Sequence, residues 1–383
     1  MEKKTAMFLI LIMFFYSCGN DRQPAAPDVE ATVAAMMTAA VATQTIAAVS
    51  YSATITATFT CTAGGANTFT STPTITLTGT FTPECTNTPS PTVTATVGPV
   101  YSFIKLWGGP SQGSGNYQFH YPMGIAVNSK GAVYVSDTNN NRIMKYDSNG
   151  NFITKWGSYG TGDYNFDGPR AVCVDAYDDV YIADINNSRI MIYDSNGIFK
   201  RKWGSNGSNP GQLDYACCAM PDNYGAVYVC DSGNHRIQKF DAVGNFIESW
   251  GENGTGQMQF VYPESIALGN DGFIYVADTG NSRIQKITVN GEFVKMWGTQ
   301  GDGDTQLHYP EGITMGTDGL LYVADTFNNR IRIYDTEGNL VGGWGEFGTG
   351  IGQFDNPFYV AMFGINALYV VDTGNSRVQK FGY

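Results

Sequence analysis

The segment "DTGNSRIQK", from Asp278 to Lys286, decides the fold of this chain because versions of it occur six times. The other copies, "DTNNNRIMK", "DINNSRIMI", "DSGNHRIQK", "DTFNNRIRI" and "DTGNSRVQK", begin at Asp137, Asp184, Asp231, Asp325 and Asp372. Each copy begins 47 residues after the one before it, without drift. A fixed period of this length is typical of repeat architectures in which each unit is one supersecondary element.

Each 47-residue unit has the pattern of four short strands. In the unit from Pro263, the apolar runs "SIAL", "FIYVAD", "RIQKI" and "EFVKMWG" are separated by the turn-forming segments "GNDG", "TGNS" and "TVNG". Four antiparallel strands repeated six times predict an all-β fold, a six-bladed β-propeller that spans residues 101–383. Each blade buries its faces against its neighbours, so a stable fold requires the whole ring.

The two ends of the repeat array predict how the ring closes. The last unit ends at "VQKFGY" and contains only three strands, while the segment 101–107 before the first unit matches the missing fourth strand. We expect this N-terminal strand to complete the last blade, which also covers two otherwise unpaired strand edges. Trp107 then corresponds to the tryptophans that end the other units, Trp156, Trp203, Trp250, Trp297 and Trp344.

The unit resembles the NHL repeat. The segments "YP-x-G-I-A", "VYVADT-x-N-x-RI" and "G-x-F-x-x-WG-x-x-G" carry this resemblance, which covers essentially all of residues 101–383. The resemblance implies a six-bladed propeller. It implies less about function, because the family includes an amidating lyase, extracellular sensor domains of bacterial kinases, and animal proteins that bind RNA or protein.

The N-terminus, "MEKKTAMFLILIMFFYSCGN", has two lysines before an apolar run that is too short to span a bilayer, which predicts a signal peptide over residues 1–17. Its end resembles the lipobox of bacterial lipoproteins and implies a lipid on Cys18. Phe15 and Tyr16 are bulkier than the usual lipobox residues, so ordinary secretion is the alternative. We expect secretion across the inner membrane and a lipid anchor in the bacterial cell envelope. Gly19 favours the outer membrane, because it replaces the Asp associated with inner-membrane retention.

Residues 18–100 form a segment of low complexity, first rich in Ala and then in Thr and Pro. Thr alternates with apolar residues at the period of a strand, but prolines interrupt the pattern and little apolar surface is present. Segments rich in Thr and Pro are typical of extended spacers that are sometimes glycosylated. We predict a largely disordered stalk, with a small β-element as the alternative.

The formal net charge of −12 argues against a nucleic-acid partner, because phosphate binding requires clustered Lys and Arg. We expect a monomer that contacts a membrane only through its lipid anchor. Because the expected location is oxidising, disulfides are expected, although the sequence leaves their pairing open. The repeat register places Cys218 and Cys230 nearly opposite each other in the first hairpin of their unit. The candidates are Cys61, Cys85, Cys173, Cys217, Cys218 and Cys230.

The repeated Asp and Arg have a structural interpretation, because a catalytic set is not needed at six separate places. We expect each Asp to end the second strand of its unit and each Arg to begin the third, so that the two charges pair locally. The pairs are Asp137 and Arg142, Asp184 and Arg189, Asp231 and Arg236, Asp278 and Arg283, Asp325 and Arg330, and Asp372 and Arg377.

Functional residues are expected where the copies differ. The position after the recurring Pro begins the innermost strand, near one mouth of the central channel. Two carboxylates and a guanidinium there could bind a small polar ligand or a cation, although a solvated charged rim fits the same pattern. The six positions, named the mouth residues below, are Met123, Arg170, Cys217, Glu264, Glu311 and Phe358.

The sequence contains no motif for a nucleophile triad, a phosphate loop or a zinc protease. Its three histidines, His120, His235 and His308, lie outside the mouth positions, so the zinc-dependent chemistry of the amidating relative is not expected. We predict no catalytic residue, no metal and no cofactor, with calcium on turn carboxylates left open. The expected function is non-catalytic: a scaffold or sensor that binds a protein, peptide or glycan on one face. The alternatives are a metal-dependent lyase or lactonase at the channel mouth and a purely structural surface protein.

Overall fold

The computed structural model describes residues 53–57, 75–79, 101–109, 111–365 and 367–382. The chain divides into two compact units, Met1–Ala95 and Thr96–Tyr383, which are considered separately. In the first, β1 (Ala53–Ala57) and β2 (Ile75–Gly79) pair antiparallel, within the segment predicted as a stalk or a small β-element. The predicted signal peptide, Cys18, Cys61 and Cys85 lie outside the described residues. In the described ranges, no helix has the length and apolar character needed to cross a membrane.

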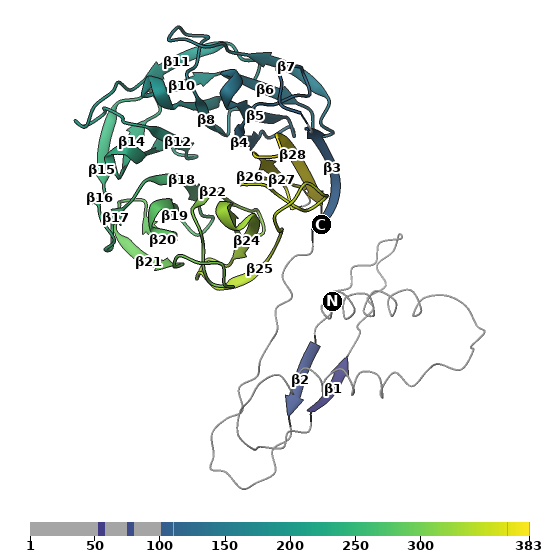
Figure 1. The fold of residues 1–383 in the computed structure, drawn as a ribbon. Helices are drawn as coiled ribbons and strands as arrows, with labels where there is room; N and C mark the ends of the chain where they lie inside the picture. The colour runs from purple at the N-terminus through teal and green to yellow at the C-terminus, as the bar shows by residue number, and fades with distance from the viewer. Residues whose placement is uncertain (1–52, 58–74, 80–100, 110, 366, 383) are drawn as a thin grey trace, which may run out of the picture. The chain divides into compact units, whose positions relative to one another are not determined.

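The second unit is a ring of six four-stranded antiparallel sheets (Figure 1). Blade 1 contains β4 (Pro122–Val127), β5 (Val133–Asp137), β6 (Arg142–Tyr146) and β7 (Phe152–Trp156). Blade 2 contains β8 (Pro169–Val174), β9 (Val180–Asp184), β10 (Arg189–Tyr193) and β11 (Phe199–Trp203). Blade 3 contains β12 (Ala216–Pro221), β13 (Ala226–Asp231), β14 (Arg236–Asp241) and β15 (Phe246–Trp250).

Blade 4 contains β18 (Pro263–Leu268), β19 (Phe273–Asp278), β20 (Arg283–Thr288) and β21 (Phe293–Trp297). Blade 5 contains β22 (Pro310–Met315), β23 (Leu321–Asp325), β24 (Arg330–Tyr334) and β25 (Leu340–Trp344). Blade 6 contains β26 (Pro357–Phe363), β27 (Ala367–Asp372), β28 (Arg377–Gly382) and β3 (Ser102–Gly108). Single 3-10 turns join the second and third strands of blades 1–5: η1 (Thr138–Asn140), η2 (Ile185–Asn187), η3 (Ser232–Asn234), η4 (Thr279–Asn281) and η5 (Thr326–Asn328). The short pair β16 (Glu252–Asn253) and β17 (Gln259–Phe260) lies in the loop before blade 4.

The predicted six-bladed propeller and its closing strand are confirmed. The N-terminal strand β3 pairs antiparallel with β28, with Trp107 opposite Val378. The first strands of the blades contact one another around the ring, in the order β4, β8, β12, β18, β22, β26 and back to β4. These first strands therefore surround the central channel, and the fourth strands form the outer edge (Figure 1).

The six tryptophans pack between neighbouring blades. Gly150, in the outer hairpin of blade 1, has a φ of +74°. A Cβ there would lie 2.8 Å from the Trp107 ring of blade 6. The pattern repeats up to Trp297, which lies against Gly338. No such hairpin covers Trp344, because that is where β3 enters the ring. Instead, the Tyr101 ring stacks on Trp344 with a centroid distance of 5.3 Å.

The repeated Asp and Arg hold the loop before each blade against the blade itself. In blade 4, Asp278 is the last residue of β19 and Arg283 the first of β20, and Arg283 Nε donates to Asp278 Oδ2 at 2.6 Å. The other oxygen, Oδ1, accepts the backbone N–H of Val261 at 2.8 Å. The guanidinium also donates to the carbonyls of Thr255, Gly256 and Gln259. Each of the other five blades has the same Arg–Asp bond at 2.6–2.7 Å.

The residue after the repeated Asp links consecutive blades. Thr279 of blade 4 donates its hydroxyl to the carbonyl of Pro310 in blade 5 at 2.6 Å. The same bond from Thr373 to Pro122, at 2.7 Å, joins blade 6 to blade 1 and so closes the ring. Ile185 takes this position in blade 2 and has no hydroxyl, so this link is missing between blades 2 and 3.

Candidate functional site: a channel mouth ringed by tyrosines

Three of the predicted mouth residues meet across the channel. Arg170 is the second residue of β8. Its Nη2 atom lies 2.9 Å from Glu264 Oε2 of blade 4 and 2.9 Å from Glu311 Oε2 of blade 5. All three residues are only 7% exposed. The mouth is therefore not a rim of solvated charges, because the charges are withdrawn from water and neutralise one another.

Two aromatic rings complete the surroundings of the guanidinium. The Cζ atom of Arg170 lies 4.8 Å from the centre of the Phe358 ring and 5.7 Å from that of Tyr215. Cations over ring faces at these distances are attracted by the ring quadrupole. Cys217 is fully buried and its thiol donates to the carbonyl of Tyr215, while Met123 is half-buried.

The two carboxylates bind the guanidinium unequally. Nη2 donates a hydrogen bond to Glu311, whereas Glu264 Oε2 is equally near but accepts no hydrogen bond from any described residue. Burial, together with the charge of Glu264, raises the pKa of Glu311 to about 8. At neutral pH Glu311 is thus mostly protonated, and the cluster carries little net charge.

An exposed tyrosine precedes the first strand in four blades. We call Tyr121, Tyr215, Tyr262 and Tyr309 together the tyrosine face; they are 44%, 41%, 51% and 39% exposed. Their backbones are left-handed, with φ between 49° and 53°, a conformation that is unfavourable for a bulky residue. The other two blades have Gly168 and Asn356 here, the residue types that tolerate this conformation.

Further aromatic side chains contact the tyrosine face. The Tyr262 ring lies 4.7 Å from the His235 ring, and the Tyr309 ring stacks on Phe327 at 4.9 Å. Phe327 is 50% exposed, and His308 contacts both Tyr309 and Phe327. The sequence analysis did not predict these residues as a site. The available signal was the position just before the first strand, where four copies have Tyr and the other two have Gly or Asn.

Comparison with known families agrees with this architecture. The NHL repeat family matches residues 119–146, 222–240, 260–287 and 307–334, which lie in blades 1, 3, 4 and 5 of the six-bladed ring. The chain is an NHL-repeat β-propeller. Protein lin-41 of Caenorhabditis elegans is 41% identical to the NHL propeller over 58 residues, which span 15% of this chain and 4% of that protein.

Solved structures with the same fold have diverse functions. A catalytically inactive virginiamycin B lyase from Staphylococcus aureus with quinupristin has a TM-score of 0.52 and 18% identity, covering 73% of this chain and 99% of that chain. A gluconolactonase from Xanthomonas campestris has a TM-score of 0.52 and 14% identity, covering 69% and 86%. An auxiliary nutrient-binding protein from Bacteroides thetaiotaomicron has a TM-score of 0.52 and 14% identity, covering 73% and 76%. At these identities the likeness concerns the fold alone.

Below the mouth, side chains obstruct the channel of the NHL propeller. Tyr359 of blade 6 reaches Ser265 of blade 4, and their hydroxyl oxygens are 2.8 Å apart. The Ser265 hydroxyl oxygen also accepts the backbone N–H of Ile313 in blade 5. The Tyr359 ring requires Gly312 beside it, since a Cβ there would lie 2.6 Å from the ring atom Cγ. Tyr359 and Ser265 therefore connect blades 6 and 4 below the mouth.

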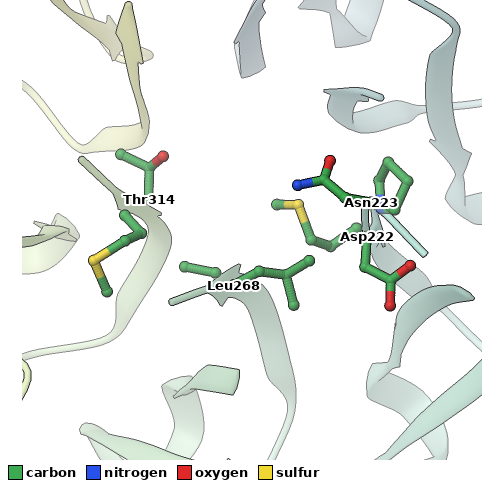
Figure 2. A pocket seen from close by; sticks show the side chains of 8 residues that line it. Asp222, Asn223, Leu268 and Thr314 are labelled. Carbon is green, nitrogen blue, oxygen red and sulfur yellow. The ribbon is translucent and has the colours of Figure 1, made fainter. Parts of the chain in front are cut away.

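The opposite end of the channel holds a cavity of about 220 Å³ (Figure 2). It is bordered by the ends of the first strands of blades 3, 4 and 5. Its residues are Met220, Pro221, Asp222, Asn223, Ala267, Leu268, Thr314 and Met315. Asp222 Oδ1 accepts the N–H groups of Tyr224 and Ala226, and its carboxylate points away from Leu268 and Thr314 (Figure 2). This carboxylate therefore shapes the hairpin turn rather than the cavity.

The cysteines of the propeller are free thiols, so the disulfide expected among Cys173, Cys217, Cys218 and Cys230 is not formed in this structure. Cys218 and Cys230 do lie opposite each other on β12 and β13, as predicted. The Cys218 thiol interacts with the thiols of both Cys173 and Cys230, which are buried beside it. Within the described ranges, no three His, Cys, Asp or Glu side chains are grouped so that they could hold a metal ion.

The raised pKa of Glu311 predicts a pH-dependent stability. Between pH about 5 and about 8 the folded protein retains a proton on Glu311 that the unfolded chain, with its ordinary pKa of 4.5, releases. The free energy of unfolding therefore falls as pH rises through this range, by up to about 1.4 kcal/mol per pH unit. Glu311→Gln should flatten this slope in urea unfolding curves. Glu337→Gln, at a side chain that is 67% exposed, should not. An unchanged slope in Glu311→Gln would refute the assignment.

Proposed function

We propose that the NHL propeller is a non-catalytic binding module, a scaffold or sensor that presents its tyrosine face to a protein, peptide or glycan. The observation that carries this proposal is the exposure of four tyrosines on unfavourable backbone around one mouth. Left-handed backbone costs about 1–2 kcal/mol per residue for most residue types, and strain of this kind clusters at functional sites. Tyr offers a large contact area with a polar end, as binding surfaces require.

The state of the mouth charges favours binding over catalysis. Arg170, Glu264 and Glu311 are already paired with one another, so a reaction would require them to separate in a buried place. A general base must also reach the proton that it removes, and these carboxylates instead face the guanidinium.

The alternative is a metal-dependent lyase or lactonase at the mouth, favoured by two carboxylates on adjacent blades. Elemental analysis of the purified full chain separates the two functions. About one equivalent of calcium or zinc per chain, lost in Glu264→Ala, would support the enzyme. If only trace metal remains after both ions have been added back and the protein has been dialysed, the result would support the binding module.

We also propose that the propeller is displayed on the bacterial cell envelope, with Cys18 lipidated and residues 18–100 as the stalk. The support is the charged and apolar N-terminal segment that ends in Ser17 and Cys18. A stalk of about 80 residues could lift a binding face well clear of a membrane, since extended chains rise about 3 Å per residue.

The binding function predicts that the tyrosine rings can be removed without loss of stability. Tyr262→Asn and Tyr309→Asn reproduce the residue of blade 6, and Asn tolerates left-handed backbone. We expect the double variant to melt within about 2 °C of the parent, or above it, and to lose binding at least about tenfold to partners found on peptide and glycan arrays. The matched control, Tyr177→Ala with Tyr224→Ala, removes rings that are 87% and 96% exposed in turns at the opposite end of the blades. Equal array binding by both variants would contradict the proposed face.

A further inference from the structure

The face that carries the tyrosines contains no Lys or Arg in its loops. Strand direction places the loops before the blades and the 3-10 turns at this same end. The six loops, residues 109–121, 157–168, 204–215, 251–262, 298–309 and 345–356, contain no Lys or Arg, and neither do the turns. Their acidic residues are Asp163, Asp167, Asp214, Glu252, Asp302, Asp304, Glu346 and Asp355.

Most of this negative charge is not neutralised within the protein. Lys202 pairs with Asp163 at 2.8 Å, and Arg332 pairs with Asp304 at 3.3 Å. Among the described residues, the other six acids make no ion pair. Three of them directly precede the left-handed position: Asp167 before Gly168, Asp214 before Tyr215 and Asp355 before Asn356. Asp214 thus adjoins a tyrosine in the sequence, whereas Asp167 and Asp355 adjoin the two positions that lack a tyrosine.

At the centre of the face, the protein already holds one cationic side chain of its own, Arg170. The Arg170 guanidinium lies between the carboxyl groups of Glu264 and Glu311 and two aromatic rings, Phe358 and Tyr215. Glu264 Oε2 retains an acceptor that no described residue uses. The same two chemical groups, carboxylates and aromatic faces, are repeated in exposed form around it. The surroundings of Arg170 show that these groups, when placed together here, hold a guanidinium.

We propose that the tyrosine face binds a cationic peptide segment, with Lys or Arg side chains over the exposed tyrosines and their charges directed to the acidic residues of the surrounding loops. This inference rests on the proposed binding function and specifies its partner. Electrostatic complementarity selects the partner's charge and accelerates its association, while the rings supply contact area. A neutral glycan would use the rings but not the carboxylates, and a nucleic acid would be repelled by them.

The test uses the full chain and two synthetic nine-residue peptides. One contains three lysines separated by Ser and Gly, and the other has Gln at the same three positions. Titration calorimetry at about 50 mM salt should show the lysine peptide bound at least about tenfold more tightly than the glutamine peptide. At about 300 mM salt this preference should shrink several-fold, because screening shortens the reach of exposed charges. Equal affinity for the two peptides would overturn the proposal.

Variants locate the binding. Tyr262→Asn with Tyr309→Asn should weaken binding of the lysine peptide at least about fivefold, and Asp214→Asn about threefold. Tyr177→Ala with Tyr224→Ala should leave it unchanged, although their turns are also acidic. Weakening by the second pair alone would overturn the proposal by placing the peptide on the other face.

The outcomes also separate this inference from the function on which it rests. Binding of the glutamine peptide or of a neutral oligosaccharide that depends on Tyr262 and Tyr309, without preference for lysine, would overturn only the cationic partner. If no peptide or glycan binds in a manner that depends on these tyrosines, both proposals are wrong.

Discussion

Trp107→Ala is expected to lower the free energy of unfolding by about 3–5 kcal/mol, the usual loss when a large buried aromatic side chain is truncated. Trp107 is 4% exposed and packs between two blades, with ring centres 5.9 Å from Tyr146 and 6.0 Å from Tyr369. β3 is an edge strand that pairs with β28, so the variant weakens the closure that joins the two ends of the ring. Urea unfolding followed by circular dichroism measures the effect.

Two comparisons make this result specific to ring closure. Ile104→Ala, on the same strand at a side chain that is 53% exposed, should change stability by less than about 0.5 kcal/mol. Trp250→Ala, at the equivalent position of blade 3, should cost about as much as Trp107→Ala. A large loss in Trp250→Ala with none in Trp107→Ala would show that β3 does not close the ring in solution.

Arg283→Ala is expected to cost a similar amount, about 3–5 kcal/mol, because it leaves a buried carboxylate without its counter-charge. Asp278 is fully buried, and Arg283 also supplies donors to three carbonyls of the preceding loop. The loop over residues 251–262 should therefore loosen first. Hydrogen exchange of the Val261 amide, which donates to Asp278, should accelerate by more than the global loss of stability explains.

The control for this prediction lies in the same blade. Lys295 is 44% exposed and lies 3.8 Å from Glu337, so Lys295→Ala removes a surface ion pair worth about 1 kcal/mol or less. Arg283→Lys keeps the charge but lacks the planar group that reaches several acceptors, and should recover only part of the stability. If Arg283→Ala costs no more than Lys295→Ala, the repeated Asp–Arg pair does not support the fold.

The propeller could be predicted from the sequence because the information is local and repeated. The strands and turns of each unit can be predicted from that unit's own residues. Because the period is 47 residues without drift, the prediction for one copy can be checked against the other five. The position of Trp107 was enough to assign β3 to the last blade, since all other units end in the same residue. The sequence left the pairing of the cysteines open, and the propeller thiols are unbonded in this structure.

The sequence by itself determined the blades and their number, and it predicted the six mouth positions. Only the tertiary structure decided that Arg170, Glu264 and Glu311 pair and are buried, since they come from blades 2, 4 and 5 and meet only when the ring is closed. The tyrosine face likewise became visible only in the tertiary structure. Whether a tyrosine before a proline is packed or exposed depends on its backbone angle and on what the neighbouring blades cover, and neither is contained in one repeat.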